Sequence, residues 1–536
     1  MTNYQFTGGT ICAPATIPGT GAISIIRVSG KESLAIADKV IDTKGVPIAE
    51  TEGYRLRYGT VFEADGSILD NVIVSVFRAP HSYTGENSVE ISCHASRFIV
   101  NKIIELLVNA GARIAAPGEF TRRAFVNGKM DLAQAEAVAD VIASQSAASH
   151  RVAMNQLKGG FSSELKVLRE KLLTMTSLLE LELDFSEEDV EFASRKELEQ
   201  LVDDSLTHIR RLTASFSRGN AIKNGIPVAI VGATNTGKST LLNALLGEER
   251  AIVSDIAGTT RDTIEETLNI DGILFRFIDT AGIRETDETI EKIGIDRTFK
   301  KLGEAAVVLG MTDLSRGGAA VLEDTDFILS KVNEMGGVKN VAAVNDGSEI
   351  GWASLAGTGG ASQHGHGDGQ KRKVVILVNK CDVAGDFYRD DNGTDYGSGN
   401  DLGENMAEIG DNKNVNHDNN IVSLIENKYD NCKVIPISAK TGKGLSTLTK
   451  TLGEIGSEIT GSTDETLVTN VRHYEALVRA ASALDSVRAG LHIATLPPDL
   501  IAQDLREALY HLGEIVGEIS TDETLGNIFR NFCIGK

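Results

Sequence analysis

The chain has 536 residues, of which 41% are hydrophobic, and its formal net charge is -22. This length exceeds what one hydrophobic core supports and predicts about three domains. The acidic charge argues against a protein that holds nucleic acid alone, because such proteins carry a basic surface, so an RNA substrate would require a basic partner.

The sequence carries no signs of export or membrane insertion. It has no run of eighteen apolar residues, and residues 1–10 contain no Lys or Arg. We therefore expect no membrane contact and a cytoplasmic location. Its five cysteines include no Cys-x-x-Cys pair, which argues against a structural zinc site or a disulfide framework.

Residues 1–128 alternate short strands and helices, which indicates an α+β domain. Residues 23–28 and 71–77 have strand composition. The pattern over residues 98–108 predicts a helix, and the following Gly111 predicts its end.

Residues 129–223 predict the first part of a helical domain. Proline is absent from Met130 to Ile222, and apolar residues recur at helical spacing. The side chains that step by three and four are Leu165, Leu168, Leu172, Met175 and Leu179. We interpret them as an ordinary core face in preference to a dimer seam.

Residues 224–456 return to alternating strands and helices, and residues 457–536 return to helix, broken at Pro497-Pro498. The simplest topology is a discontinuous helical domain with an α/β domain inserted between its two parts. Low-complexity stretches at about 348–370 and 384–419 interrupt the insert and cannot order themselves. His364 and His366 fit a loop better than a metal site, because no third ligand lies near in sequence.

A phosphate-binding loop opens the inserted domain. The apolar strand 228–231 is followed by Gly232-Ala233-Thr234-Asn235-Thr236-Gly237-Lys238-Ser239, and a helix begins at Thr240. In this setting backbone N–H groups and the helix N-terminus bind phosphate oxygens. Lys238 would neutralise the β- and γ-phosphates, and the Ser239 hydroxyl would bind Mg²⁺.

Four more short motifs follow in the order that a GTPase needs. They are the first switch with Thr259 and Thr260, then Asp279-Thr280-Ala281-Gly282, Asn379-Lys380-Cys381-Asp382 and Ser438-Ala439-Lys440. The Asp382 carboxylate can accept both N–H groups on the guanine edge, which adenine does not offer. The set predicts an α/β P-loop G domain that selects GTP over ATP.

The catalytic group for hydrolysis is not the usual glutamine. Ras-like GTPases place Gln after Asp-x-x-Gly to orient water, and here that position is Ile283. The Asn235 oxygen could help bind a K⁺ that replaces an arginine finger electrostatically. Glu291 is a candidate for orienting water, although its residue type alone favours a solvated charge on a helix.

These motifs, the insertion topology and the terminal Phe532-Cys533-Ile534-Gly535-Lys536 resemble the tRNA modification GTPase family MnmE (TrmE). Segments 25–30, 83–90 and 117–136 are also similar to the family. The resemblance covers nearly the whole chain apart from the two low-complexity stretches. The chain departs from the family at Thr234, where proline is usual, and in the longer segment between Thr312 and Lys373.

In the G domain the resemblance implies four groups of site residues. Ser239 and Thr260 would bind Mg²⁺, and Glu291 would orient the attacking water. K⁺ would be held by Asn235, Ser254, Ile256 and Thr259, and would draw two G domains together. The nucleotide would contact Asn235, Thr236, Gly237, Lys238, Ser239, Thr240, Ser254, Asp255, Ile256, Ala257, Gly258, Thr259, Thr260, Asp279, Thr280, Ala281, Gly282, Asn379, Lys380, Asp382, Ser438, Ala439 and Lys440.

Outside the G domain the resemblance implies a folate site and a reactive tail. The N-terminal domain would form a homodimer and bind a tetrahydrofolate derivative, 5-formyl- or 5,10-methylene-tetrahydrofolate. Its contacts would be Arg27, Glu90, Lys129 and Lys536, and Cys533 would be catalytic. Without the resemblance each of these would be an ordinary surface or salt-bridge residue, and Cys533 a thiol of a frayed tail.

The implied function is a K⁺-stimulated GTPase acting with an FAD-binding MnmG-like partner in a heterotetramer or larger complex. Together they would add a (carboxymethyl)aminomethyl group to carbon 5 of the wobble uridine of certain tRNAs. Two alternatives remain open at this point. One is a ribosome-assembly GTPase, and the other is a folate-dependent aminomethyltransferase with a regulatory G domain.

Overall fold

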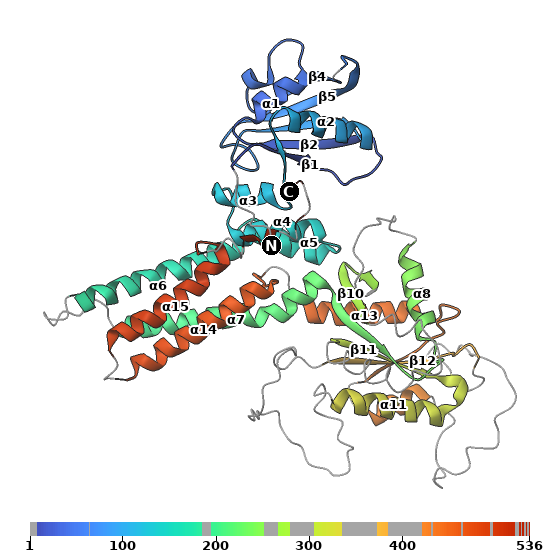
Figure 1. Ribbon diagram of the computed structural model, residues 1–536. Helices are drawn as coiled ribbons and strands as arrows, with labels where there is room; N and C mark the ends of the chain where they lie inside the picture. The colour runs from blue at the N-terminus through green and yellow to red at the C-terminus, as the bar shows by residue number, and fades with distance from the viewer. Residues whose placement is uncertain are drawn as a thin grey trace, which may run out of the picture. The chain divides into compact units, whose positions relative to one another are not determined.

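The computed structural model describes residues 8–63, 65–184, 195–250, 266–278, 305–334, 372–383, 421–429, 432–461, 465–493 and 497–519. In the C-terminal tail it describes 525, 526, 528, 529, 532 and 535. The chain divides into two compact units (Figure 1). Unit 1 contains residues 1–143, 153–214 and 470–536, and unit 2 contains 144–152 and 215–469.

Unit 1 begins with a mixed sheet. Among the described residues its strand order is β3-β4-β5-β6-β2-β1-β7, antiparallel except for the parallel pair β1 and β7. The strands are β1 (Ile11–Pro14), β2 (Ile23–Ser29), β3 (Ile41–Asp42), β4 (Arg55–Phe62), β5 (Ile68–Phe77), β6 (Ser88–His94) and β7 (Arg113–Ile114).

Helices α1 (Ser33–Val40) and α2 (Arg97–Asn109) cover one face of this sheet. Ile26, Val74 and Ile91 point into that core. Because side chains alternate along a strand, Arg27 and Glu90 lie on the opposite face. The predicted strands 23–28 and 71–77 and the predicted helix 98–108 are confirmed as β2, β5 and α2.

The rest of unit 1 is helical. Helix α15 packs along both α14 and α6, so segments from before and after unit 2 lie side by side (Figure 1). The helices are α3 (Glu119–Val126), α4 (Leu132–Ala143), α6 (Gly160–Asp184), α7 (Arg195–Asn224), α14 (Val471–Leu491) and α15 (Pro498–Val516). The predicted break at Pro497-Pro498 is the start of α15.

The apolar face of α6 is buried within the chain. Leu165, Leu168, Leu172 and Leu179 are each less than a tenth exposed, and Met175 is half-buried. Their interpretation as an ordinary core face is therefore confirmed. Helix α7 and a neighbouring helix, α5 (Ala147–Leu157), each carry residues of both units.

Unit 2 is built on a second sheet. Its strand order within the described residues is β13-β12-β11-β8-β10-β9, and only the β9–β10 pair is antiparallel. The strands are β8 (Ile226–Val231), β9 (Glu266–Ile270), β10 (Ile273–Ile278), β11 (Val307–Asp313), β12 (Lys373–Asn379) and β13 (Lys433–Pro436).

Helices cover both faces of this sheet, as a parallel sheet requires. Apolar residues of α8 (Lys238–Arg250) and α13 (Leu445–Thr460) join one core, and those of α11 (Gly318–Glu334) and α12 (Ile421–Lys428) join the other. Ligands of such folds bind beyond the carboxyl ends of the parallel strands. The loops after β8, β11 and β12 meet at that edge.

The expected fold class is confirmed at the level of an N-terminal α/β sheet domain, a helical domain and a second α/β domain. Within the described ranges, no helix is long and apolar enough to cross a membrane.

Candidate functional site

The loop between β8 and α8 has the backbone geometry of a phosphate cradle. Asn235 has φ 61° and Gly237 has φ 99°, so both lie in the left-handed region. A Cβ atom on Gly237 would lie 2.4 Å from the Nδ2 atom of Asn379, which only glycine avoids. Such turns direct successive N–H groups into one concavity, where the N-terminus of α8 adds positive potential.

Lys238 is the first residue of α8 and bends back over this loop. Its Nζ atom donates hydrogen bonds to the carbonyl oxygens of Gly232 at 2.9 Å and Ala233 at 2.7 Å. Burial lowers the pKa of Lys238 from its usual value. The ammonium group is therefore held where an anion at the mouth of the loop would pair with it.

Asn379 joins three of the predicted motifs. Its Nδ2 atom donates to the carbonyl oxygen of Thr236 at 2.7 Å, and its Oδ1 atom accepts from the N–H group of Ala439 at 2.9 Å. Asn379 is buried, as are Thr236 and Ser438. Residues that lie far apart in sequence are thus brought together at the carboxyl edge of the sheet.

Asp382 and Lys440 extend from these loops into solvent. A ligand could therefore hydrogen-bond to the Asp382 carboxylate without displacing any protein contact that the structure records. Ser239 and Thr240 continue α8, with a half-buried and an exposed side chain respectively. The described part of the predicted nucleotide site therefore has exposed side chains at Asp382, Lys440 and Thr240 around the buried Asn379.

Asp313 is a member of this site that the sequence motifs did not indicate. Its Oδ2 atom pairs with Lys380 Nζ at 2.6 Å, and its Oδ1 atom accepts from the Ser315 hydroxyl at 2.6 Å. Burial acts to raise the pKa of Asp313, but the hydrogen bonds from Lys380 and Ser315 lower it. The signal available in the sequence was a polar residue at the end of an apolar strand. The structure places that strand, β11, between β8 and β12.

Several predicted residues lie outside the described part of the chain. They are Ser254, Asp255, Ile256, Ala257, Gly258, Thr259, Thr260, Asp279, Thr280, Ala281, Gly282, Ile283, Glu291, His364, His366, Cys533 and Lys536.

A second polar site lies on the face of the unit 1 sheet opposite α1 and α2. Arg27 on β2 pairs with Glu90 on β6, with Nη2 2.8 Å from Oε1. The guanidinium carbon of Arg27 lies 5.1 Å from the ring centre of Tyr83 and 5.7 Å from that of Phe120. The Arg27 guanidinium therefore lies against two aromatic rings, and the pair stays partly open to solvent.

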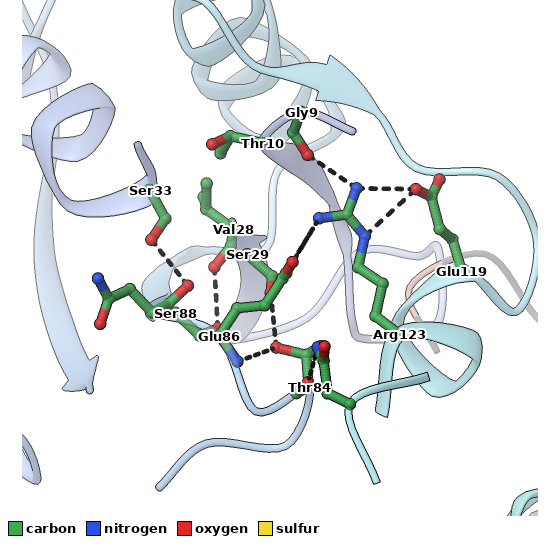
Figure 2. A network of polar contacts seen from close by, with 12 residues as sticks. Gly9, Thr10, Val28, Ser29, Ser33, Thr84, Glu86, Ser88, Glu119 and Arg123 are labelled. Carbon is green, nitrogen blue, oxygen red and sulfur yellow. Dashed lines mark hydrogen bonds and ion pairs between the residues drawn. The ribbon is translucent and has the colours of Figure 1, made fainter. Parts of the chain in front are cut away.

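A buried arginine fixes the segments around this pair (Figure 2). Arg123 on α3 is 2% exposed and pairs with Glu86 at 2.9 Å and with Glu119 at 2.9 Å. Glu86 in turn accepts from the Ser29 hydroxyl at 2.9 Å. Since Ser29 lies two residues after Arg27, the network sets the relative position of β2, the loop before β6 and α3.

Lys129 follows α3 and donates from Nζ to the carbonyl oxygen of Pro80 at 3.1 Å. The tail also reaches this region. A Cβ atom built on Gly535 would lie 2.0 Å from the carbonyl oxygen of Pro14, so the two backbones are in contact. Pro14 ends β1, where Ala13 pairs with Arg27 in the sheet register. The structure therefore brings the end of the tail to the strand beside Arg27.

Comparison with known proteins identifies relatives of the whole chain. The family model "GTP-binding protein TrmE N-terminus" matches residues 10–129, and the model "MnmE helical domain" matches residues 132–533. A "tRNA modification GTPase MnmE" from Parabacteroides distasonis is 46% identical over 530 residues, which are 98% of this chain and 100% of the relative.

Two further relatives with the same description show similar agreement. The one from Bacteroides thetaiotaomicron is 44% identical over 98% of this chain and 99% of its own length. The one from Flavobacterium johnsoniae is 45% identical over 98% of this chain and 99% of its own length. The resemblance found in the sequence motifs is thereby confirmed.

Proposed function

Because the chain belongs to the MnmE (TrmE) family of tRNA modification GTPases, we propose that it hydrolyses GTP to modify certain tRNAs. The observation that supports this proposal is the sequence match to a tRNA modification GTPase, which covers 98% of this chain and 100% of the relative. The reaction would place a (carboxymethyl)aminomethyl group on carbon 5 of the wobble uridine. An FAD-binding, MnmG-like partner would act with this chain in a heterotetramer or larger complex in the cytoplasm.

The residues of the loop after β8 fit a nucleotide. Left-handed backbone at Asn235 and Gly237, the N-terminus of α8 and the ammonium of Lys238 would together provide positive potential for the phosphates. Asp382 and the Ser438–Lys440 loop would read the guanine edge. Ser239 and Thr260 would hold Mg²⁺, which neutralises charge on the phosphates.

Hydrolysis would depend on K⁺. Asn235, Ser254, Ile256 and Thr259 would hold the ion, which supplies the positive charge that an arginine finger supplies in other GTPases. Glu291 would orient the attacking water, since Ile283 has no group that can. The exposed side chain of Asn235 supports its part in this set.

The second site would bind the tetrahydrofolate derivative that supplies the one-carbon unit. Glu90 offers a carboxylate for the N–H edge of a pterin, and Arg27 and Lys129 offer cations for carboxylates. Lys536 would add a further cation, and Cys533 would act as the catalytic thiol. Contact between Gly535 and Pro14 supports a role for the tail at this site.

A homodimer through the sheet of unit 1 is part of the proposal. The sheet face that α1 and α2 leave open carries Leu56, Tyr58 and Ile73, which are 65%, 68% and 48% exposed. Tyr58 and Ile73 are direct neighbours across β4 and β5. Exposed apolar side chains gathered on one face mark interaction surfaces, and a second copy would cover them.

The tRNA assignment is tested in a strain that lacks the gene. Nucleoside mass spectrometry of its tRNA should show loss of the modified wobble uridine, and a plasmid copy should restore it. An unchanged nucleoside profile in the deletion strain rejects the assignment. If the protein instead co-sediments with ribosomal subunits and binds no folate, the ribosome-assembly alternative replaces it.

A further inference from the structure

The turn that carries Asp382 has a backbone conformation that needs support. Lys380 has φ 64°, in the left-handed region that few side chains adopt. The N–H group of Val383 donates to the carbonyl oxygen of Lys380 at 3.1 Å, which closes a turn over residues 380–383. Such a conformation persists only where surrounding contacts hold it. Because Asp382 lies within this turn, the same contacts decide where its exposed carboxylate lies.

The residues on either side of Lys380 are anchored to other loops of unit 2. Asn379 is held through its side-chain amide, which bonds to the backbone of two neighbouring loops. Cys381 is buried, and its N–H group and its thiol both donate to the carbonyl oxygen of Ile437, at 3.2 and 2.9 Å. These bonds hold the backbone before and after Lys380, but they do not involve the Lys380 side chain.

Asp313 makes the contact to the Lys380 side chain. It is the last residue of β11, and in the sheet register it lies directly beside Asn379. Its Oδ2 atom lies 2.6 Å from Lys380 Nζ. Since Asp313 is only 5% exposed, solvent and salt screen this pair less than they screen a surface pair. The pair therefore ties the left-handed residue of the turn to the end of a buried strand.

The other carboxylate oxygen of Asp313 has a separate role. The Oδ1 atom accepts from the N–H group of Ser315 at 3.0 Å and from its hydroxyl at 2.6 Å, and thereby caps a short 3₁₀ helix (Leu314–Arg316). Asparagine at this position would keep the cap. It would lose the pair, because its amide nitrogen and the Lys380 ammonium are both donors. The two roles of Asp313 can thus be separated by one substitution.

We propose that Asp313 is a positioning residue for guanine recognition. Through its pair with Lys380 it holds the left-handed turn, and thereby keeps the Asp382 carboxylate where it accepts both N–H groups of the guanine edge. The inference rests on the proposed function, because it assumes that Asp382 binds the base. It adds a residue of β11, outside the five sequence motifs, on which the choice of base depends.

The test compares the affinities of the full-length protein for GDP, inosine diphosphate and ADP by calorimetry with excess Mg²⁺. Inosine diphosphate lacks the 2-amino group of guanine, so it offers Asp382 one N–H group where GDP offers two. The variants are Asp313→Asn, Lys380→Met and the two combined. Asp326→Asn is the matched control, because Asp326 on α11 pairs with Lys428 at 2.9 Å in the same unit and both side chains are half exposed.

Wild type and Asp326→Asn should bind GDP about tenfold or more tighter than inosine diphosphate, because the analogue leaves the carboxylate one hydrogen bond short. In Asp313→Asn this ratio should fall to about twofold or less, since a displaced Asp382 loses its bonds to both bases. The combined variant should bind GDP no more weakly than Lys380→Met, because both changes break the same pair. A merely structural role would weaken binding of both nucleotides by one factor.

An unchanged ratio in Asp313→Asn overturns the inference and leaves the proposed function intact. If Asp313→Asn does not fold, Lys380→Met decides in its place. A direct contact of the Lys380 ammonium with nucleotide would affect GDP and inosine diphosphate equally, so a changed ratio still reports the position of Asp382. Wild type that binds GDP no better than ADP overturns the proposed guanine site together with the inference.

Discussion

The two candidate sites are assembled in opposite ways. In unit 2, the loop from Gly232 to Ser239 is one uninterrupted segment between β8 and α8, and most of its geometry is local. In unit 1, Arg27 and Glu90 lie on different strands, Lys129 follows α3, and Gly535 reaches β1 from the far end of the chain.

The contrast shows what each site needs in order to persist. A phosphate loop needs the right backbone turns and a helix start, which a short sequence supplies. The site in unit 1 needs distant segments to be held in place, and buried ion pairs do this. Arg123 connects β2 and α3 through Glu86, and Arg472 connects α4 and α15 through Glu136.

The largest expected effect tests the local character of the nucleotide site. Lys238→Ala should reduce GTP turnover by about a hundredfold or more, because one preorganised positive charge at the phosphates is lost. It should leave folate binding unchanged. Steady-state phosphate release measures this, with Lys428→Ala on α12 as the control. Turnover near wild type would show that the loop is not the catalytic site.

The next effect concerns the buried pairs on which unit 1 depends. The pKa of Glu136 is lower in the folded protein than in the unfolded chain, so its contribution to stability is present above about pH 4.5 and disappears as pH falls towards 2. That contribution is about 3 kcal/mol at neutral pH.

Glu136→Gln should therefore lower stability at pH 7 and make it less dependent on pH between 5 and 3. Denaturant titrations of wild type and variant at several pH values measure the difference. Parallel pH profiles for the two proteins would show that Glu136 is not held charged by Arg472 and His473.

A third effect separates the two sites by ligand. Arg27→Gln should weaken binding of 5-formyl-tetrahydrofolate by about ten- to a hundredfold, since hydrogen bonds to charged groups are lost. GTP turnover in the absence of tRNA should not change. Calorimetry measures the affinity, and Arg55→Gln on the exposed surface of β4 is the control. Equal affinities for Arg27→Gln and wild type would remove Arg27 from the proposed folate site.

The smallest expected effect concerns the proposed K⁺ site at Asn235. Replacing K⁺ with Na⁺ should slow GTP turnover by about tenfold or more, because the smaller ion fits the proposed ligands poorly and its charge is lost from the site. Asn235→Ala should be equally slow in both salts. Equal turnover of wild type in K⁺ and Na⁺ would contradict a monovalent-cation site at Asn235.

The same contrast explains how much of the fold and of the candidate sites could be predicted from the sequence. Strand and helix patterns located β2, β5 and α2, and a contiguous motif predicted the turn that lies between β8 and α8. The link from Asn379 to Thr236 and Ala439 follows from the order of the strands in a parallel sheet. The Asp313–Lys380 pair was missed because an aspartate after a buried strand has no motif of its own.

In unit 1, composition and periodicity did not single out the polar residues. Arg27, Glu90 and Lys129 were proposed from family resemblance, since each alone has the properties of an ordinary surface residue. The roles of Arg123 and Arg472 depend on burial and on contacts between segments far apart in sequence, such as Arg472 with Glu136. Such pairings follow from tertiary packing and have no local signal.

The most direct test of the account asks whether one modified nucleoside requires both sites. Cells that lack the gene are complemented with wild type, Lys238→Ala, Arg27→Gln or Cys533→Ser, and their tRNA nucleosides are measured by mass spectrometry. The account predicts that wild type restores the modified wobble uridine and that all three variants fail, although Arg27→Gln and Cys533→Ser still hydrolyse GTP. Full modification with Arg27→Gln and Cys533→Ser would contradict it, because the site in unit 1 would then have no part in the reaction.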